Sequence, residues 1–142
     1  MIPQVVVVDA SVVVEYLVEL KLTREAKHLF NSLRETDGIE FWAPDLLYPE
    51  AVSALRKLVG LGAIPAGAGT RAVDRLVRLP IAAAGTAALM VEAWKLRHAL
   101  TPYDACYVAL ARRLGARFVT ADQRLVRGLS TPDVIFLGDF EF

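Results

Sequence analysis

The chain of 142 residues contains one cysteine and two histidines, which excludes several kinds of functional site at the outset. A single thiol, Cys106, can form neither an intrachain disulfide nor a zinc site built from several thiolates. Cys106 lies in an apolar helical pattern that is typical of a small core residue. His28 and His98 lack the spacing of paired metal ligands, so we interpret both as surface residues. We therefore expect neither thiol nor histidine chemistry.

Long hydrophobic runs and an excess of one charge are also missing. The longest weakly polar stretch, residues 81–94, contains Gly85, Thr86 and Glu92 and is too short to span a bilayer. The N-terminus lacks the basic segment and the small-residue cleavage site of a signal peptide. Sixteen Lys and Arg residues balance sixteen Asp and Glu residues, so a nucleic-acid site has to be a local patch. We expect a soluble, cytoplasmic protein that does not interact with membranes.

Three motifs of common enzyme classes are absent as well. The sequence contains no P-loop and no G-x-S-x-G motif, and the segment from Gly67 to Gly69 lacks the third glycine of a dinucleotide fingerprint. We therefore do not expect P-loop nucleotide hydrolysis, dinucleotide binding or serine-hydrolase chemistry.

What the sequence does contain is the composition of one globular domain, with 55% hydrophobic and 23% charged residues. Apolar runs predict strands at residues 5–8, 39–43, 79–83, 117–120 and 134–137. Apolar residues at helical spacing predict one helix that Thr23 caps and others at residues 10–20, 44–60, 70–79, 86–98, 102–114 and 122–127. Strands that alternate with helices predict a three-layer α/β/α fold with a mostly parallel central sheet, formed by residues 1–142 as a single domain.

Four acidic residues stand out because each follows a strand or begins a helix that is otherwise apolar. Asp9 comes directly after a predicted strand, and Asp122 comes two residues after the end of another. Glu50 and Asp104 lie in the first turns of predicted helices. Each of them also has a purely structural explanation. Asp9 and Asp122 can cap the helices that follow them. Asp104 with Thr101 resembles a capping box, and Glu50 suits the positive end of a helix dipole.

The predicted topology brings these four acids together. In a parallel α/β sheet, the carboxyl ends of strands and the starts of the following helices share one edge. Converging carboxylates in a partly buried cleft stay ionised only where a cation compensates them. Carboxylate oxygens suit Mg²⁺ or Mn²⁺, which activates water and stabilises the leaving oxygen of a phosphodiester. The four acids therefore indicate metal-dependent phosphodiester hydrolysis.

The same acids lie in four segments: Asp9-Ala-Ser11-Val, Pro44-Asp-Leu-Leu-Tyr-Pro-Glu50, Leu100-Thr-Pro-Tyr-Asp104-Ala-Cys-Tyr-Val-Ala-Leu-Ala and Phe118-Val-Thr120-Ala-Asp122. Their order and spacing resemble those of the PIN-domain family over nearly the whole chain, and the last two segments are the most specific. In its short length the chain resembles the VapC toxins of type II toxin–antitoxin pairs. This resemblance implies a Mg²⁺- or Mn²⁺-dependent endoribonuclease, usually a homodimer, that a small VapB-type antitoxin inhibits.

The resemblance also implies roles for individual residues. The implied catalytic residues and metal ligands are Asp9, Glu50, Asp104 and Asp122, with Ser11 and Thr120 supporting them through hydroxyl contacts. Pro49 departs from the family pattern and removes a backbone donor directly before Glu50, so Asp45 remains an alternative acid at this place.

Basic and aromatic residues suggest where RNA and partners bind. Five arginines lie in a short segment with one acid, and we interpret three of them as RNA-binding, with a solvated helix face as the alternative: Arg112, Arg124 and Arg127. Three tyrosines can stack on bases, although core packing is favoured: Tyr48, Tyr103 and Tyr107. The apolar helix near the N-terminus offers a surface for a second copy or an antitoxin through Val12, Val13, Tyr16 and Leu17.

Two other functions stay open from the residues alone. One is a PIN-domain nuclease of RNA maturation or decay, and the other is a non-catalytic binding module whose acids only cap helices.

Overall fold

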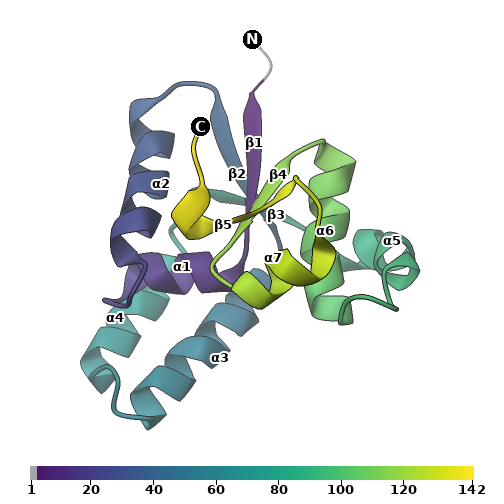
Figure 1. The fold of residues 1–142 in the computed structure, drawn as a ribbon. Helices are drawn as coiled ribbons and strands as arrows, with labels where there is room; N and C mark the ends of the chain where they lie inside the picture. The colour runs from purple at the N-terminus through teal and green to yellow at the C-terminus, as the bar shows by residue number, and fades with distance from the viewer. Residues whose placement is uncertain (1–2) are drawn as a thin grey trace.

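The computed structural model describes residues 3–142, which form a five-stranded sheet in the order β3-β2-β1-β4-β5 (Figure 1). All four neighbouring strand pairs of this sheet are parallel. The strands are β1 (Gln4–Val8), β2 (Ile39–Pro44), β3 (Ile81–Ala84), β4 (Arg117–Thr120) and β5 (Val134–Phe136). The predicted α/β fold with a mostly parallel sheet is therefore confirmed.

Helices cover both faces of this sheet. They are α1 (Ala10–Leu17), α2 (Thr23–Glu35), α3 (Leu47–Gly60), α4 (Ala66–Leu76), α5 (Met90–Lys95), α6 (Pro102–Leu114) and α7 (Gln123–Leu129), with short 3₁₀ turns η1 (Thr86–Leu89) and η2 (Leu137–Asp139). Figure 1 shows α2 on one side of the strands and α6 on the other, which gives the three layers. Within residues 3–142, no helix has the length and apolar character needed to cross a membrane.

The central strand β1 lies between β2 and β4, and the helices that cover both faces of the sheet bury its side chains. Val6, Val7 and Val8 are completely buried, as a continuous β-branched run predicts for a parallel strand. This central position matters for the site, because the residue that follows Val8 is Asp9, which is placed at the middle of the carboxyl edge.

Helix α6 begins and ends where its local signals predict. The Thr101 side chain accepts a hydrogen bond from the backbone amide of Asp104 at 3.2 Å, and Pro102 occupies the first turn. Gly115 ends the helix in the left-handed conformation at φ 61°, which favours glycine. Asp104 is thereby fixed in the first turn of a helix whose following residues are buried.

The N-terminal helices depart from the predictions in two ways. Thr23 was expected to cap α2, but its hydroxyl instead accepts from the amide of Leu20 and donates to the carbonyl of Val18. These bonds hold the connection between α1 and α2, so α1 ends at Leu17 and not at residue 20. The apolar surface expected on α1 is mostly absent because Val12, Val13 and Leu17 are buried in the core.

Helices α3 and α4 and the segment before α6 differ from the predicted element boundaries. Helix α3 begins at Leu47, so Pro49 lies in its first turn, where a backbone N–H has no acceptor within the helix. Helix α4 begins at residue 66, directly after Pro65, and not at residue 70. The single helix expected at residues 86–98 is divided into η1 and α5.

Candidate active site

The four acids lie at the same edge of the sheet, its carboxyl edge. Asp9 directly follows β1, Asp122 follows the neighbouring strand β4, and Glu50 and Asp104 lie in the first turns of α3 and α6. Desolvation is the main cause of the raised pKa of Asp9, Glu50 and Asp104, and a neighbouring negative charge adds to it: that of Asp104 for Asp9 and Glu50, and that of Asp122 for Asp104. We call these four residues the carboxylate cluster.

Asp9 is the most firmly held member of the cluster, and its side chain is only 8% exposed. The Ser11 hydroxyl and the backbone amide of Val12 donate to its Oδ1, at 2.5 and 3.2 Å. The Thr120 hydroxyl donates to its Oδ2 at 2.6 Å. Both carboxylate oxygens therefore have protein donors, which fixes the orientation of the group.

The two hydroxyls also connect Asp9 to the segment after β4. Ser11 Oγ accepts from the backbone amide of Ala121 at 3.0 Å, and Thr120 Oγ1 accepts from the amide of Asp122 at 3.0 Å. The hydroxyl contacts that the family resemblance implies for Ser11 and Thr120 are present in the structure, and they join the first turn of α1 to the end of β4.

Helix capping and clustering occur together at this edge. Asp9 caps α1 through the amide of Val12, and Asp122 caps α7 by accepting from the amide of Arg124 at 3.0 Å. At Thr101 the cap uses the backbone of Asp104, so the Asp104 carboxylate is not needed for it. The capping explanation therefore accounts for Asp9 and Asp122 but leaves the charge of Asp104 without a structural use.

Burial sets the protonation of the cluster. Desolvation raises the pKa of Asp9 to about 6, against the lowering effect of the Ser11 and Thr120 hydrogen bonds. Desolvation also raises the pKa of Glu50 and of Asp104. At neutral pH the edge holds several carboxylates whose negative charges are unfavourable where they lie.

Glu50 has a partner that sequence reasoning missed. The Tyr107 hydroxyl, on α6, donates to Glu50 Oε1 at 2.7 Å. Tyr107 is only 2% exposed, so its ring belongs to the core and is not available for base stacking. Burial raises the pKa of Glu50, and the charge of Asp104 adds to this rise.

The donor chemistry of the cluster fits a hard divalent cation. Its members offer carboxylate oxygens alone, and burial, with a smaller contribution from like-charged neighbours, raises the pKa of Asp9, Glu50 and Asp104. Across residues 3–142, no three Asp, Glu, His or Cys side chains are already close enough together to share one ion. An ion at this edge would therefore have to draw the less firmly held carboxylates toward Asp9.

Comparison with known proteins identifies the family. The family model described as "PIN domain" matches residues 6–128, which is most of the chain. The chain belongs to the PIN-domain family. A curated relative, Ribonuclease VapC9 from Mycobacterium tuberculosis, is 39% identical over 82 residues, which are 58% of this chain and 65% of the relative. The chain thus matches a little under two thirds of the length of that relative.

Solved structures show the same fold at low sequence identity. VapC20 from M. tuberculosis, described as a sarcin-ricin loop cleaving toxin, has a TM-score of 0.62 and 17% identity, covering 86% of this PIN domain and 93% of that chain. A toxin–antitoxin complex from Klebsiella pneumoniae has a TM-score of 0.63 and 16% identity, and the match covers 96% of this chain and 99% of the matched chain. At these identities the likeness concerns the fold alone.

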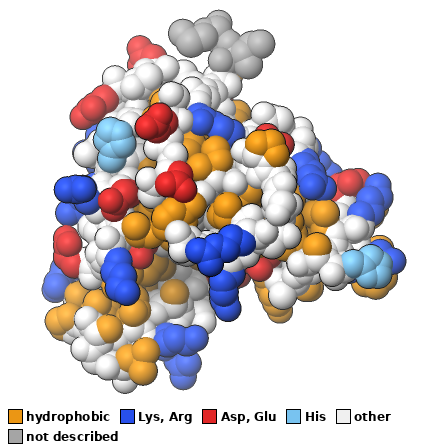
Figure 2. Space-filling view, viewed as in Figure 1, with side chains coloured by type: hydrophobic (Ala, Val, Ile, Leu, Met, Phe, Trp, Pro, Cys, Tyr) orange, Lys and Arg blue, Asp and Glu red, His pale blue; other side chains and the backbone are white. Residues whose placement is uncertain are grey.

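The arginines expected to bind RNA lie at different distances from the cluster of this PIN domain. Arg124 is next to it, because its Nε lies 3.5 Å from Asp122 Oδ1 and its charge lowers the pKa of Asp104. Arg127 lies one turn further along α7. Arg112 is eight residues beyond Asp104 on α6, roughly 12 Å along the helix axis. Figure 2 shows acidic and basic side chains interspersed over the face of Figure 1.

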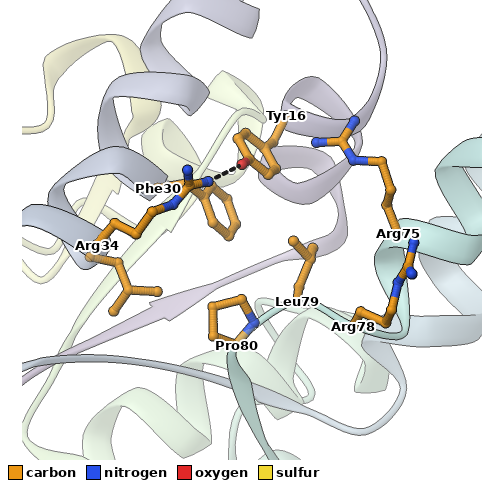
Figure 3. A pocket seen from close by; sticks show the side chains of 8 residues that line it. Tyr16, Phe30, Arg34, Arg75, Arg78, Leu79 and Pro80 are labelled. Carbon is orange, nitrogen blue, oxygen red and sulfur yellow. Dashed lines mark hydrogen bonds between the residues drawn. The ribbon is translucent and has the colours of Figure 1, made fainter.

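A second group of arginines surrounds a pocket away from the cluster (Figure 3). This pocket of about 450 Å³, which we call the arginine pocket, is lined by Tyr16, Phe30, Leu33, Arg34, Arg75, Arg78, Leu79 and Pro80. Arg34 donates to the Tyr16 hydroxyl at 3.2 Å, and Arg75 lies 5.4 Å from the centre of the Tyr16 ring. Arg78 pairs with Asp74 at 2.6 Å. Each guanidinium group here already has a partner within the fold.

Proposed function

We propose that this PIN domain, residues 1–142, is a Mg²⁺- or Mn²⁺-dependent endoribonuclease and the toxin of a VapBC-type toxin–antitoxin pair. The observation that carries the proposal is the cluster itself: Asp9 is buried and firmly held at the edge where three more carboxylates lie, and the cap at Thr101 does not use the carboxylate of Asp104. The name of VapC9 as a ribonuclease, and the description of VapC20 as a toxin that cleaves an RNA loop, support the activity.

The proposed ligands of the ion are Asp9, Glu50, Asp104 and Asp122. A bound Mg²⁺ or Mn²⁺ supplies an activated water and stabilises the leaving oxygen of the cleaved phosphodiester. The hydrogen bonds from Ser11 and Thr120 keep Asp9 in one orientation and favour its ionised form. A donor set of carboxylates without histidine or thiolate favours such hard cations over zinc.

Arginine side chains are proposed to bind the RNA backbone. Arg124 is 91% exposed and borders the cluster, so it can contact a phosphate near the cleaved bond. Arg127 extends this basic surface along α7, and Arg112 would bind a more distant phosphate. These arginines also reduce the repulsion between an RNA phosphate and the carboxylates.

Two protein partners belong to the proposal. A small antitoxin of the VapB type is supported by the likeness to the toxin–antitoxin complex, and its gene is expected directly upstream. A second copy of the chain has a candidate surface on α5, where Met90, Val91 and Trp94 are 41%, 70% and 67% exposed. Sedimentation of the purified protein tests the homodimer. The proposed compartment is the cytoplasm.

Cleavage of a panel of structured RNAs tests the activity. We expect cleavage with Mg²⁺ or Mn²⁺ and none with EDTA, because the carboxylates alone provide no activated water. Restoring Mn²⁺ after EDTA should restore cleavage, which controls for loss of the fold. Equal cleavage in chelator would contradict the metal mechanism, and no cleavage of any RNA would favour a binding module. An upstream frame unrelated to antitoxins would favour RNA maturation or decay.

A further inference from the structure

Tyr107 combines a buried ring with a hydroxyl that reaches the carboxylate cluster. Its ring stacks on Phe118 of β4, with the ring centres 5.6 Å apart and the planes at 6°. A phenylalanine would fill the same space between α6 and β4 and make the same stacking contact. Core packing therefore accounts for an aromatic ring at this position but not for its hydroxyl.

The hydroxyl has a specific partner in another element of the chain. It donates to Glu50 Oε1 at 2.7 Å, and so joins α6 to the first turn of α3 across 57 residues of sequence. Among the side-chain hydrogen bonds of residues 3–142, it is the only one that Glu50 accepts. Asp9 has three donors on its two oxygens, whereas Glu50 depends on this single contact.

We propose that the Tyr107 hydroxyl is a positioning group that holds one oxygen of Glu50 and so fixes this carboxylate for a divalent cation. This inference rests on the proposed function. Without the hydroxyl, Glu50 has a flexible side chain, a half-buried charge and one like-charged neighbour, Asp104, that repels it. A hydrogen bond to one oxygen fixes the side-chain torsions and leaves Oε2 without a protein donor. Tyr107 acts through Glu50 and contacts neither RNA nor the ion.

The decisive variant is Tyr107→Phe, which removes one oxygen atom and keeps the ring. Partners that orient metal-binding side chains typically contribute 10–100-fold in metal affinity. We therefore expect the Mn²⁺ concentration that gives half of the maximal thermal stabilisation, measured without RNA, to rise about 10-fold or more. The matched control is Tyr16→Phe, which removes a hydroxyl that accepts from Arg34 in the arginine pocket. Its Mn²⁺ response should equal that of the unchanged protein.

A double-mutant cycle tests whether the effect passes through Glu50. In a Glu50→Gln background, Tyr107→Phe should weaken Mn²⁺ binding by no more than a further 2-fold. A full additional loss in that background would overturn the positioning role, as would an unchanged Mn²⁺ response of Tyr107→Phe alone. If Tyr107→Phe does not fold, Glu50→Asp is the second variant. It keeps the charge but is one methylene too short for the hydroxyl, and an unchanged Mn²⁺ response there would also overturn the proposal.

The outcomes for the unchanged protein separate this inference from the proposed function. If the unchanged protein shows neither stabilisation by Mn²⁺ nor Mn²⁺-dependent cleavage, the proposed function fails and the Tyr107 inference fails with it. If the unchanged protein shows both and Tyr107→Phe matches it, only the role of Tyr107 is wrong.

Discussion

The carboxylate cluster and the arginine pocket each bring several charges of one sign together, but they treat those charges differently. In the arginine pocket, Arg34 and Arg75 contact Tyr16, and Arg78 pairs with Asp74. In the cluster, burial and, to a smaller extent, the like charges nearby raise the pKa of three members. Groups that the fold has satisfied serve the fold, whereas groups held together against their repulsion indicate a ligand.

The largest effect is expected where the repulsion has no structural use. Asp104→Asn should lower RNA cleavage by at least about 10³-fold, because a neutral amide is a poor ligand for Mg²⁺. The cap at Thr101 uses only the backbone of residue 104 and should survive. Without metal, the unfolding free energy should stay the same or rise by up to about 1 kcal/mol, because one of several crowded carboxylates is removed. Cleavage assays beside melts in EDTA measure both quantities.

The matched control for this variant is Asp74→Asn, which changes the acid that pairs with Arg78 of the arginine pocket. It removes an exposed pair with Arg78 and should cost roughly 0.3–0.5 kcal/mol of stability while cleavage stays unchanged. Retained cleavage in Asp104→Asn would sink the catalytic assignment of Asp104. Clear destabilisation without metal would show that its carboxylate also has a structural role.

A smaller effect is expected from the titration of Asp9. Because its native pKa is raised from 3.8 to about 6, the folded state binds this proton more tightly than the unfolded state does. The stability that the folded protein gains from protonated Asp9 is therefore fully present below pH 3.8 and is lost as the pH rises through about 6. The loss is of the order of 3 kcal/mol of unfolding free energy in the metal-free protein.

Asp9→Asn isolates that contribution. In EDTA, the unfolding free energy of the variant, relative to that of the unchanged protein, should increase from pH 4 to pH 7. The reason is that the unchanged protein loses stability as Asp9 ionises, whereas the amide of the variant does not ionise. Denaturant unfolding at several pH values measures this difference. At a saturating concentration of a divalent cation the unchanged protein should be the more stable of the two, because its ionised carboxylate binds the ion and the amide does not. A pH-independent difference in EDTA would mean that burial does not disfavour the charged form of Asp9.

Sequence reasoning reached the features that depend on local signals. The limits of α6 follow from Thr101, Pro102 and Gly115, and β1 follows from its valine run. The placement of the four acids at one edge of the sheet was predicted because the carboxyl edge is a property of parallel topology and not of any single contact. Those parts of the fold and the site needed no knowledge of side-chain packing.

The parts that sequence reasoning missed depend on contacts between distant residues. The bond between Tyr107 and Glu50 spans 57 residues, and a tyrosine in an apolar helix looks the same with or without it. The sequence predicts that the hydroxyl of Thr23 caps α2. In the structure this hydroxyl instead forms hydrogen bonds with Val18 and Leu20, which precede the helix. Arg112 was grouped with Arg124 by sequence proximity, but the length of α6 separates it from the cluster.

The smallest effect distinguishes the arginines of the two regions. Replacing Arg124 and Arg127 by Gln should weaken RNA binding and reduce its dependence on salt, by about 0.7 in the log–log slope for each lost single-strand phosphate contact. Replacing Arg75 and Arg78 by Gln removes the same charge from the arginine pocket. That variant should keep the slope but lose about 1 kcal/mol of stability, because a cation–π contact and an ion pair are broken. Binding of RNA over a salt series, in Ca²⁺ to prevent cleavage, compares the two variants at equal net charge. If both lowered the slope equally, RNA would be responding to overall charge, and the position of Arg124 beside the carboxylates would have no special part in binding.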